Sequence, residues 1–119
     1  MSLARHVYET FESVVGPGNI SEAPSIMAGY RRSGPHAPLS PSPEAVLLPA
    51  STEEIQAIVK ICNRYDIAYI ATVSGLSVQA YPDRPATIVL HLRRMNRIVE
   101  INETDRYAVV EPGVRHGQL

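Results

Sequence analysis

The stretch TIVLHLRRMNRIVEINETDRYAVVEPGV, which runs from Thr87 to Val114, decides the fold of this chain. It contains three short apolar runs, separated by charged or turn-forming residues: Thr87–Leu92, Arg97–Ile101 and Tyr107–Val110. Valine, isoleucine, threonine and tyrosine dominate these runs, and that composition is typical of β-strands. The stretch therefore predicts a meander of three strands.

Two turn signals divide and end this meander. The segment Asn102–Asp105 has the residue types of a hairpin loop and lies between the second and third runs. Pro112 and Gly113 end the third strand, because proline offers no amide to a strand ladder and glycine permits a positive φ. We expect a sharp and rigid turn at this place.

A βαβ unit precedes the meander. Ala45–Leu48 is a continuous apolar run, as expected of a strand that is buried on both faces, and Pro49 ends it. Ile67–Ala71 is the next predicted strand, and a helical pattern lies between the two. Crossovers of this kind are right-handed, so the two strands are predicted to be parallel.

The helix of this unit has a clear start signal. Ser51 to Glu54 reads as a capping box, in which the Ser51 hydroxyl accepts an amide proton and Glu54 reaches back. The helix is predicted to run from Thr52 to Tyr65. Four apolar residues at helical spacing define the face that is predicted to meet the core: Ile55, Ile58, Val59 and Cys62.

The N-terminal part of the chain predicts helices and then a loop. Apolar residues at helical spacing predict a helix over Ser2–Val15, with Ser2 as its cap: Leu3, Val7, Phe11, Val14 and Val15. A second short helix is predicted within Asn19–Tyr30. Residues 31–43 hold four prolines among thirteen residues, which favours an extended surface loop. We therefore divide the chain into an N-terminal helical segment with a proline-rich arm (1–43) and a domain over 44–119.

These elements together predict an α/β (α+β) fold. A small mixed sheet holds the βαβ unit followed by the β-meander, and the N-terminal helices pack alongside it. We expect all five predicted strands to lie in one sheet.

Composition excludes several classes of protein. The chain has 119 residues, 45% of them hydrophobic, and 11 basic residues against 12 acidic ones. This charge balance gives no electrostatic basis for binding nucleic acid or an anionic membrane. No apolar run approaches the roughly 18 residues of a membrane span, and the single Cys62 excludes an internal disulfide. We expect a cytoplasmic protein that binds neither nucleic acid nor membrane.

The order of motifs resembles one flavoprotein family. LRRMNRI at Leu92–Ile98 is followed by Glu100-Ile101 and then by VVEPGV at Val109–Val114. This order is similar to that in the FAD-binding domain of FAD-linked oxidases of the p-cresol methylhydroxylase and vanillyl-alcohol oxidase type. The resemblance continues upstream over Glu44–Ile67, and it implies that FAD is the cofactor.

The resemblance also implies where the pyrophosphate of FAD lies. Backbone amides in the segment after the second βαβ strand turn toward the phosphates in such domains, and hydroxyl groups add donors. The cofactor-binding residues implied in this segment are Thr72, Val73, Ser74, Gly75, Leu76 and Ser77. Only Gly75 among them is a glycine, and Val73, Leu76 and Val78 stand where the family has small residues. An ordinary connecting loop is therefore the alternative interpretation.

Pro112 and Gly113 are the remaining cofactor-binding residues that the resemblance implies, because this turn lies along the FAD in the family. We assign no catalytic residue and no metal ligand. The four histidines show no spacing typical of metal ligands: His6, His36, His91 and His116.

The resemblance covers only the first part of the family's catalytic chain. We therefore expect the first lobe of an FAD-binding domain, which is catalytically incomplete by itself. In a complete enzyme, electrons would pass to the flavin from an organic alcohol, a phenol or a hydroxy acid. The alternative is a non-catalytic, oligomerising module that keeps this fold and has lost FAD binding. In either case we expect an apolar surface that a second lobe or a second copy of the chain covers.

Overall fold

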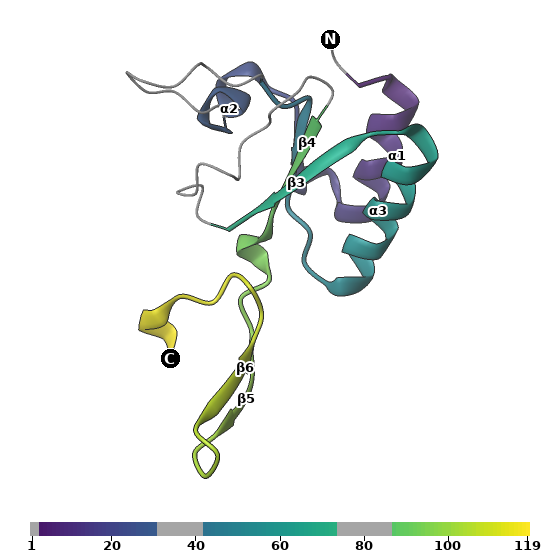
Figure 1. The fold of residues 1–119 in the computed structure, drawn as a ribbon. Coiled ribbons are helices and arrows are strands. Elements are labelled where there is room, and N and C mark those ends of the chain that lie inside the picture. Colours follow the sequence, from purple (N-terminus) through teal and green to yellow (C-terminus); the bar gives the residue numbers. More distant parts are fainter. Residues whose placement is uncertain (1–2, 31–41, 74–86) are drawn as a thin grey trace.

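The computed structural model describes residues 3–30, 42–73 and 87–119 (Figure 1). Three α-helices and six strands occur in these ranges: α1 (Arg5–Val15), β1 (Ile20–Ser21), α2 (Pro24–Met27), β2 (Ala45–Leu47), α3 (Thr52–Tyr65), β3 (Ala68–Thr72), β4 (Thr87–His91), β5 (Ile98–Asn102) and β6 (Tyr107–Val110). Short 3₁₀ turns lie at Pro17–Asn19, Ala28–Tyr30, Leu92–Arg94 and His116–Gln118. The predicted α/β (α+β) class is confirmed.

Four strands form a mixed sheet in the order β1-β2-β4-β3. β2 and β3 both run parallel to β4, whereas β1 is antiparallel to β2. The predicted parallel arrangement of the two βαβ strands is therefore confirmed, and β4 lies between them. Four consecutive β4 residues, Thr87–Leu90, are buried, because a central parallel strand is covered on both faces.

The helices α1 and α3 pack side by side and share the main core with the sheet (Figure 1). Along α1, Val7, Phe11 and Val15 recur every four residues and are all buried, which places them on one face. The predicted helix over Ser2–Val15 therefore exists, but it begins at Arg5. Its N-cap is Ala4, which makes no side-chain cap.

The α3 helix contacts the core through a face slightly different from the predicted one. Ile58 and Cys62 are buried as predicted. Ile55 and Val59 are only partly buried, and Ile61 is buried in their place. The neighbouring α1 helix explains the shift, because it covers the side of α3 on which Ile61 lies together with Ile58. Burial raises the pKa of the Cys62 thiol to about 11.

Both ends of α3 have specific caps. The Ser51 hydroxyl accepts a hydrogen bond from the Glu54 amide (3.2 Å), and the Glu54 carboxylate accepts one from the Ala50 amide. The predicted capping box is thus present, with Glu54 reaching the amide one residue before Ser51. Asp66 ends the helix in the left-handed conformation (φ 55°).

A smaller cluster covers the other face of the sheet. Met27 of α2 packs with Val46 of β2 and Val89 of β4, and Tyr30 lies against them. The segment Asn19–Tyr30 therefore contains the predicted short helix, together with the unpredicted strand β1. That strand is only two residues long, too short to leave a periodic pattern in the sequence. The division of the chain at residue 43 stays a prediction.

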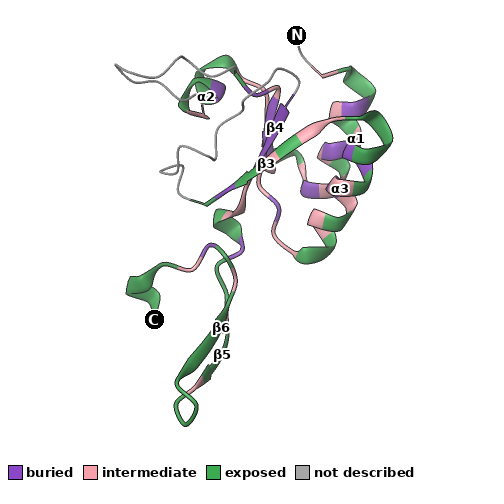
Figure 2. Cartoon of the chain, in the orientation of Figure 1, coloured by how far each residue is buried: buried purple, intermediate pink, exposed green. Residues whose placement is uncertain are grey.

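The hairpin β5–β6 forms a sheet of its own, so the expectation that all five strands share one sheet was wrong. The 3₁₀ turn Leu92–Arg94 redirects the chain after β4 and breaks the ladder there. The hairpin projects away from the four-stranded sheet and is largely exposed (Figures 1 and 2). Its loop is the predicted one, closed by a hydrogen bond from the Asp105 amide to Asn102 Oδ1 (2.8 Å).

Candidate functional site

The carboxyl ends of three parallel strands meet at one edge of the sheet. Thr72 at the end of β3 is the register partner of His91 at the end of β4, and Leu47 at the end of β2 is the partner of Leu90. Open α/β sheets bind ligands outside this edge, where the loops that follow the strands converge. We call this end of the sheet, where β2, β3 and β4 finish, the carboxyl edge. It is the candidate site.

The end of β3 supplies the first predicted site residues. Thr72 is buried, and Val73 has an exposed side chain. The Val73 carbonyl oxygen lies 2.7 Å from Nε2 of His91, within hydrogen-bonding distance. Four predicted residues lie outside the described residues: Ser74, Gly75, Leu76 and Ser77. Their role in binding stays a prediction.

The turn at Pro112 and Gly113 packs against the turn that follows β4. The Gly113 amide donates a hydrogen bond to the Met95 carbonyl (2.7 Å). A β-carbon at Gly113 would lie 2.7 Å from the carbonyl oxygens of both Leu92 and Met95. Glycine is therefore required here by close backbone approach. The expected reason, a positive φ, was wrong, because Gly16 is the glycine with positive φ in the described part of the chain.

Glu111 also joins the turn after β6 to the MNRI turn, through contacts with Arg97. Its carboxylate accepts a hydrogen bond from the Arg97 amide (2.9 Å) and lies 3.5 Å from Nε of Arg97. The Glu111 amide in turn donates to the Arg97 carbonyl (2.9 Å). The MNRI and EPGV motifs are therefore two halves of one packed structure, and Pro112 lies exposed on its surface. This packing gives a physical reason for their occurring together.

A polar cavity of about 500 Å³ opens beside these turns. Its lining comes from the start of α3 and from both turns: Ala50, Ser51, Thr52, Glu53, Arg94, Asn96, Arg97 and Glu111. Arg94 also donates from Nη1 to the Leu48 carbonyl (2.6 Å), which ties the turn after β4 to the end of β2. In the sequence, Arg94 and Arg97 stood out only as members of the LRRMNRI motif. Their position just after a buried strand was the signal that could have placed them at this edge.

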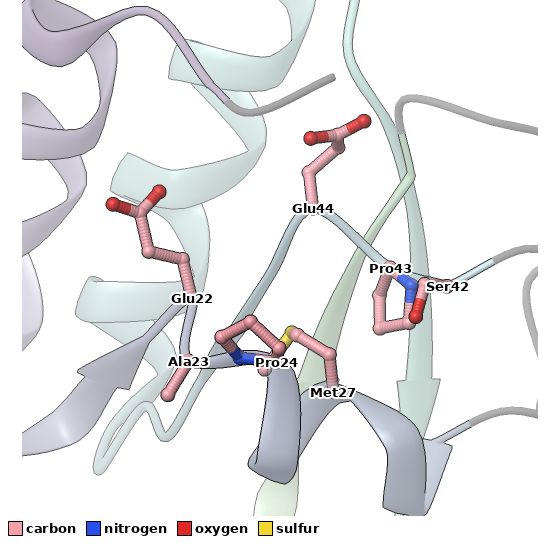
Figure 3. A pocket seen from close by; sticks show the side chains of 7 residues that line it. All are labelled: Glu22, Ala23, Pro24, Met27, Ser42, Pro43 and Glu44. Carbon is pink, nitrogen blue, oxygen red and sulfur yellow. The ribbon is translucent and has the colours of Figure 1, made fainter.

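A second cavity, of about 560 Å³, lies at the opposite edge of the sheet. Figure 3 shows its lining, in which the Glu22 and Glu44 carboxylates project on the same side. Glu22 follows β1 and Glu44 precedes β2, so this cavity is at the amino end of the parallel strands. The described lining holds two carboxylates and no basic side chain, unlike the polar cavity beside the turns, and the cavity is therefore a poor site for the pyrophosphate of FAD.

Within residues 3–30, 42–73 and 87–119, no group of three or more histidine, cysteine or acidic side chains is placed to hold a metal ion. The helices in these same ranges include none that is both long and apolar enough to cross a lipid bilayer.

Comparisons with known proteins agree on one family. The family described as "FAD binding domain" matches residues 43–119. D-2-hydroxyglutarate dehydrogenase of Stutzerimonas stutzeri (strain A1501) is 34% identical over 114 residues, which cover 93% of this chain and 24% of that protein. The flavoprotein subunit of 4-cresol dehydrogenase [hydroxylating] from Pseudomonas putida is 29% identical over 115 residues, which cover 93% of this chain and 22% of that protein.

A solved structure shows the same fold. The crystal structure of p-cresol methylhydroxylase with substrate bound superposes with a TM-score of 0.84 at 28% identity, over 95% of this chain and 23% of that one. The chain thus spans about a quarter of the length of the proteins it matches.

Proposed function

This chain belongs to the FAD binding domain family, in the form found in FAD-linked oxidases of the p-cresol methylhydroxylase type, and from that premise we propose that it binds FAD. The observation that carries the proposal is the packing of the EPGV turn on the MNRI turn at the carboxyl edge. This arrangement puts Pro112 and Gly113 next to the residues that follow β4, at the edge where α/β sheets bind their ligands.

The polar cavity at this edge is lined by two arginines, Arg94 and Arg97, as well as by two carboxylates, Glu53 and Glu111. Thr72 ends β3, Val73 follows it and His91 ends β4. None of these three side chains is a carboxylate, and Arg93 lies two residues beyond His91. We propose that the pyrophosphate lies against the backbone amides of residues 73–77, with Thr72, Ser74 and Ser77 as hydroxyl donors. Pro112 and Gly113 would lie along the cofactor.

We propose further that this binding serves an FAD-linked oxidoreductase. When bound, FAD supplies an acceptor for two electrons from a substrate. An organic alcohol, a phenol or a hydroxy acid is the proposed substrate class, and the names of the hydroxyglutarate and cresol dehydrogenases support it. The residues of this chain would bind and orient the cofactor, and none is proposed to react with the substrate.

Substitutions in the predicted phosphate loop test the placement of FAD. Backbone amides would make the contact, so Ser74→Ala should change the Kd for FAD by less than about threefold. Gly75→Val adds a β-branched side chain where the phosphate approaches and restricts φ, so it should weaken binding by at least about tenfold. The measurement is a fluorescence titration of each folded variant with FAD. Equal Kd values for the wild type and the Gly75 variant would contradict the placement.

A second candidate function is a non-catalytic module that associates through the same fold. Exposed apolar residues on the hairpin favour it, namely Val99 (56%), Ile101 (57%), Tyr107 (45%), Val109 (44%) and Val110 (40%). Val73, which belongs to the predicted phosphate loop, is also exposed (38%). The two strands of the hairpin pair with each other and with no other described strand, so their outer edges are open. A hairpin with open edges and this composition favours contact with a protein partner, either a second lobe or a second copy of the chain.

Sedimentation at micromolar concentration tests the association. We expect a homo-oligomer, most simply a twofold dimer, because an isologous contact covers the same surface on both copies. The double change Val99→Lys and Ile101→Lys should shift it toward monomer, whereas the charge change Glu103→Lys in the hairpin loop should not. A monodisperse wild-type monomer would remove this proposal.

A further inference from the structure

A chain of two hydrogen bonds joins three distant parts of the sequence at the carboxyl edge. His91 ends β4, and its Nε2 lies 2.7 Å from the carbonyl oxygen of Val73, the residue after β3. Its Nδ1 lies 2.7 Å from the hydroxyl of Tyr30, the last residue of the 3₁₀ turn Ala28–Tyr30. The Tyr30 and His91 rings also meet edge to face, with centroids 5.8 Å apart.

The direction of both hydrogen bonds follows from the chemistry of the acceptor. A carbonyl oxygen can only accept, so Nε2 of His91 carries the hydrogen and donates to Val73. A neutral imidazole has a single N–H, so Nδ1 has a free lone pair and accepts from the Tyr30 hydroxyl. Burial lowers the pKa of His91 below its usual 6.5, and the neighbouring Arg93 adds to this effect while the hydrogen bond to Val73 opposes it, so the neutral ring is favoured.

We propose that Tyr30 and His91 are positioning residues for FAD binding, acting through the carbonyl of Val73. This inference rests on the proposed function, since it assumes that the pyrophosphate meets the amides after β3. A trans peptide group is planar, and its carbonyl and amide point in opposite directions. An oxygen held toward His91 therefore fixes the orientation of the Val73 carbonyl, and the amide bonded to that carbonyl is one of the proposed donors of the phosphate loop.

The alternative orientation of this peptide would harm binding. If the peptide rotated, it would turn a carbonyl oxygen, in place of an N–H, toward the bound anion. The Tyr30 hydroxyl opposes this rotation indirectly, because it holds the imidazole in the tautomer that donates at Nε2. Tyr30 also packs on the cluster of Met27, Val46 and Val89, so its own position is fixed by the core.

Four variants test the proposal by FAD titration. His91→Leu removes the donor and should raise the Kd for FAD at least about tenfold. His91→Gln offers an amide N–H to Val73, so it should stay within about threefold of wild type. Tyr30→Phe should fall between them. Tyr69→Phe, an exposed tyrosine on β3, is the matched control and should leave the Kd unchanged.

A nuclear magnetic resonance measurement on the FAD-free protein tests the hydrogen bonds independently. The long-range proton–nitrogen spectrum of the His91 ring at pH 7.5 should show the neutral Nε2–H tautomer, and Tyr30→Phe should move the resonance of the unprotonated Nδ1, which loses its hydrogen-bond donor. A ring with its hydrogen on Nδ1 would overturn the proposal, whether or not FAD binds.

The outcomes separate this proposal from the function it rests on. A folded wild-type chain that takes up no FAD would remove both. A wild-type chain that binds FAD, together with a folded Leu variant of equal Kd, would remove the positioning role alone. If His91→Leu does not fold, Tyr30→Phe serves as the test instead. Equal Kd values for FAD in Tyr30→Phe and in the wild type would then overturn the proposal.

Discussion

Gly113 lies against three backbone carbonyl oxygens, and this contact joins the turn after β4 to the turn after β6. Because the neighbouring atoms are backbone, they cannot move aside as the end of a flexible side chain would. A change at this one position should therefore disturb the whole carboxyl edge.

Gly113→Ala should lower the free energy of unfolding by about 1–3 kcal/mol, the usual cost of forcing extra atoms into a packed site. Urea denaturation measures it. Gly117→Ala is the matched control, because no atom lies within 4 Å of its added β-carbon, and it should stay within about 0.5 kcal/mol of wild type. Equal stability of the two variants would show that the turns do not pack in this way.

His91 makes stability depend on pH. Burial is the main cause that lowers its pKa below the usual 6.5; the hydrogen bond to Val73 opposes this shift, and Arg93 adds to it. As the pH falls, the unfolded chain takes up this proton before the folded chain does. The stability that His91 contributes is thus complete above pH 6.5 and is lost as the pH falls from there through the pKa of the folded state.

Urea denaturation of the wild type and of His91→Gln between pH 8 and pH 5 tests this effect. The midpoint should fall more steeply with decreasing pH in the wild type, because glutamine does not titrate. Parallel curves would mean that His91 is solvated in the folded chain.

At the scale of elements, α3 is the helix that closes the main core. Ile58 is fully buried between α1 and the sheet. Ile58→Ala should therefore cost roughly 2–5 kcal/mol of unfolding free energy, the range for truncating a buried aliphatic side chain. Ile101→Ala removes the same atoms from an exposed position on β5 and should cost less than about 1 kcal/mol. Similar unfolding midpoints for both variants would place Ile58 on the wrong face.

Local signals in the sequence were sufficient to predict most of the helices and strands. The Ser51 and Glu54 cap, the β5–β6 hairpin and the parallel βαβ strands could all be predicted, because each depends on residues close in sequence or on a general rule of handedness. The position of β4 between β2 and β3 could not, because pairing across a sheet depends on tertiary contacts. The separate sheet of the hairpin depends on the 3₁₀ turn at Leu92–Arg94, which has no periodic signal.

The candidate site shows the same division. Pro112 and Gly113 could be selected by resemblance to a family. The packing of Gly113 on the carbonyl oxygens of Leu92 and Met95 could be seen only in the three-dimensional structure. Tyr30 and His91 are 61 residues apart, and no pattern in the sequence connects them. From the sequence, His91 was considered only as one of four histidines that show no spacing typical of metal ligands.

At the scale of the whole molecule, a small α/β body presents its carboxyl edge toward a projecting, largely exposed hairpin (Figures 1 and 2). The body and the hairpin meet at the packed MNRI and EPGV turns. A cofactor at this edge would therefore lie where both parts of the molecule can contribute to its binding.

Titration of the folded chain with FAD and, separately, with riboflavin is the most direct test of cofactor binding through the phosphates. Riboflavin has the flavin ring but neither the pyrophosphate nor the adenosine, so the two ligands separate binding through the ADP part of FAD from binding through the flavin ring. We expect saturable binding of FAD, followed by flavin fluorescence, and at least about tenfold weaker binding of riboflavin. A chain that is folded by circular dichroism and leaves FAD unbound up to about 1 mM would contradict the proposed function.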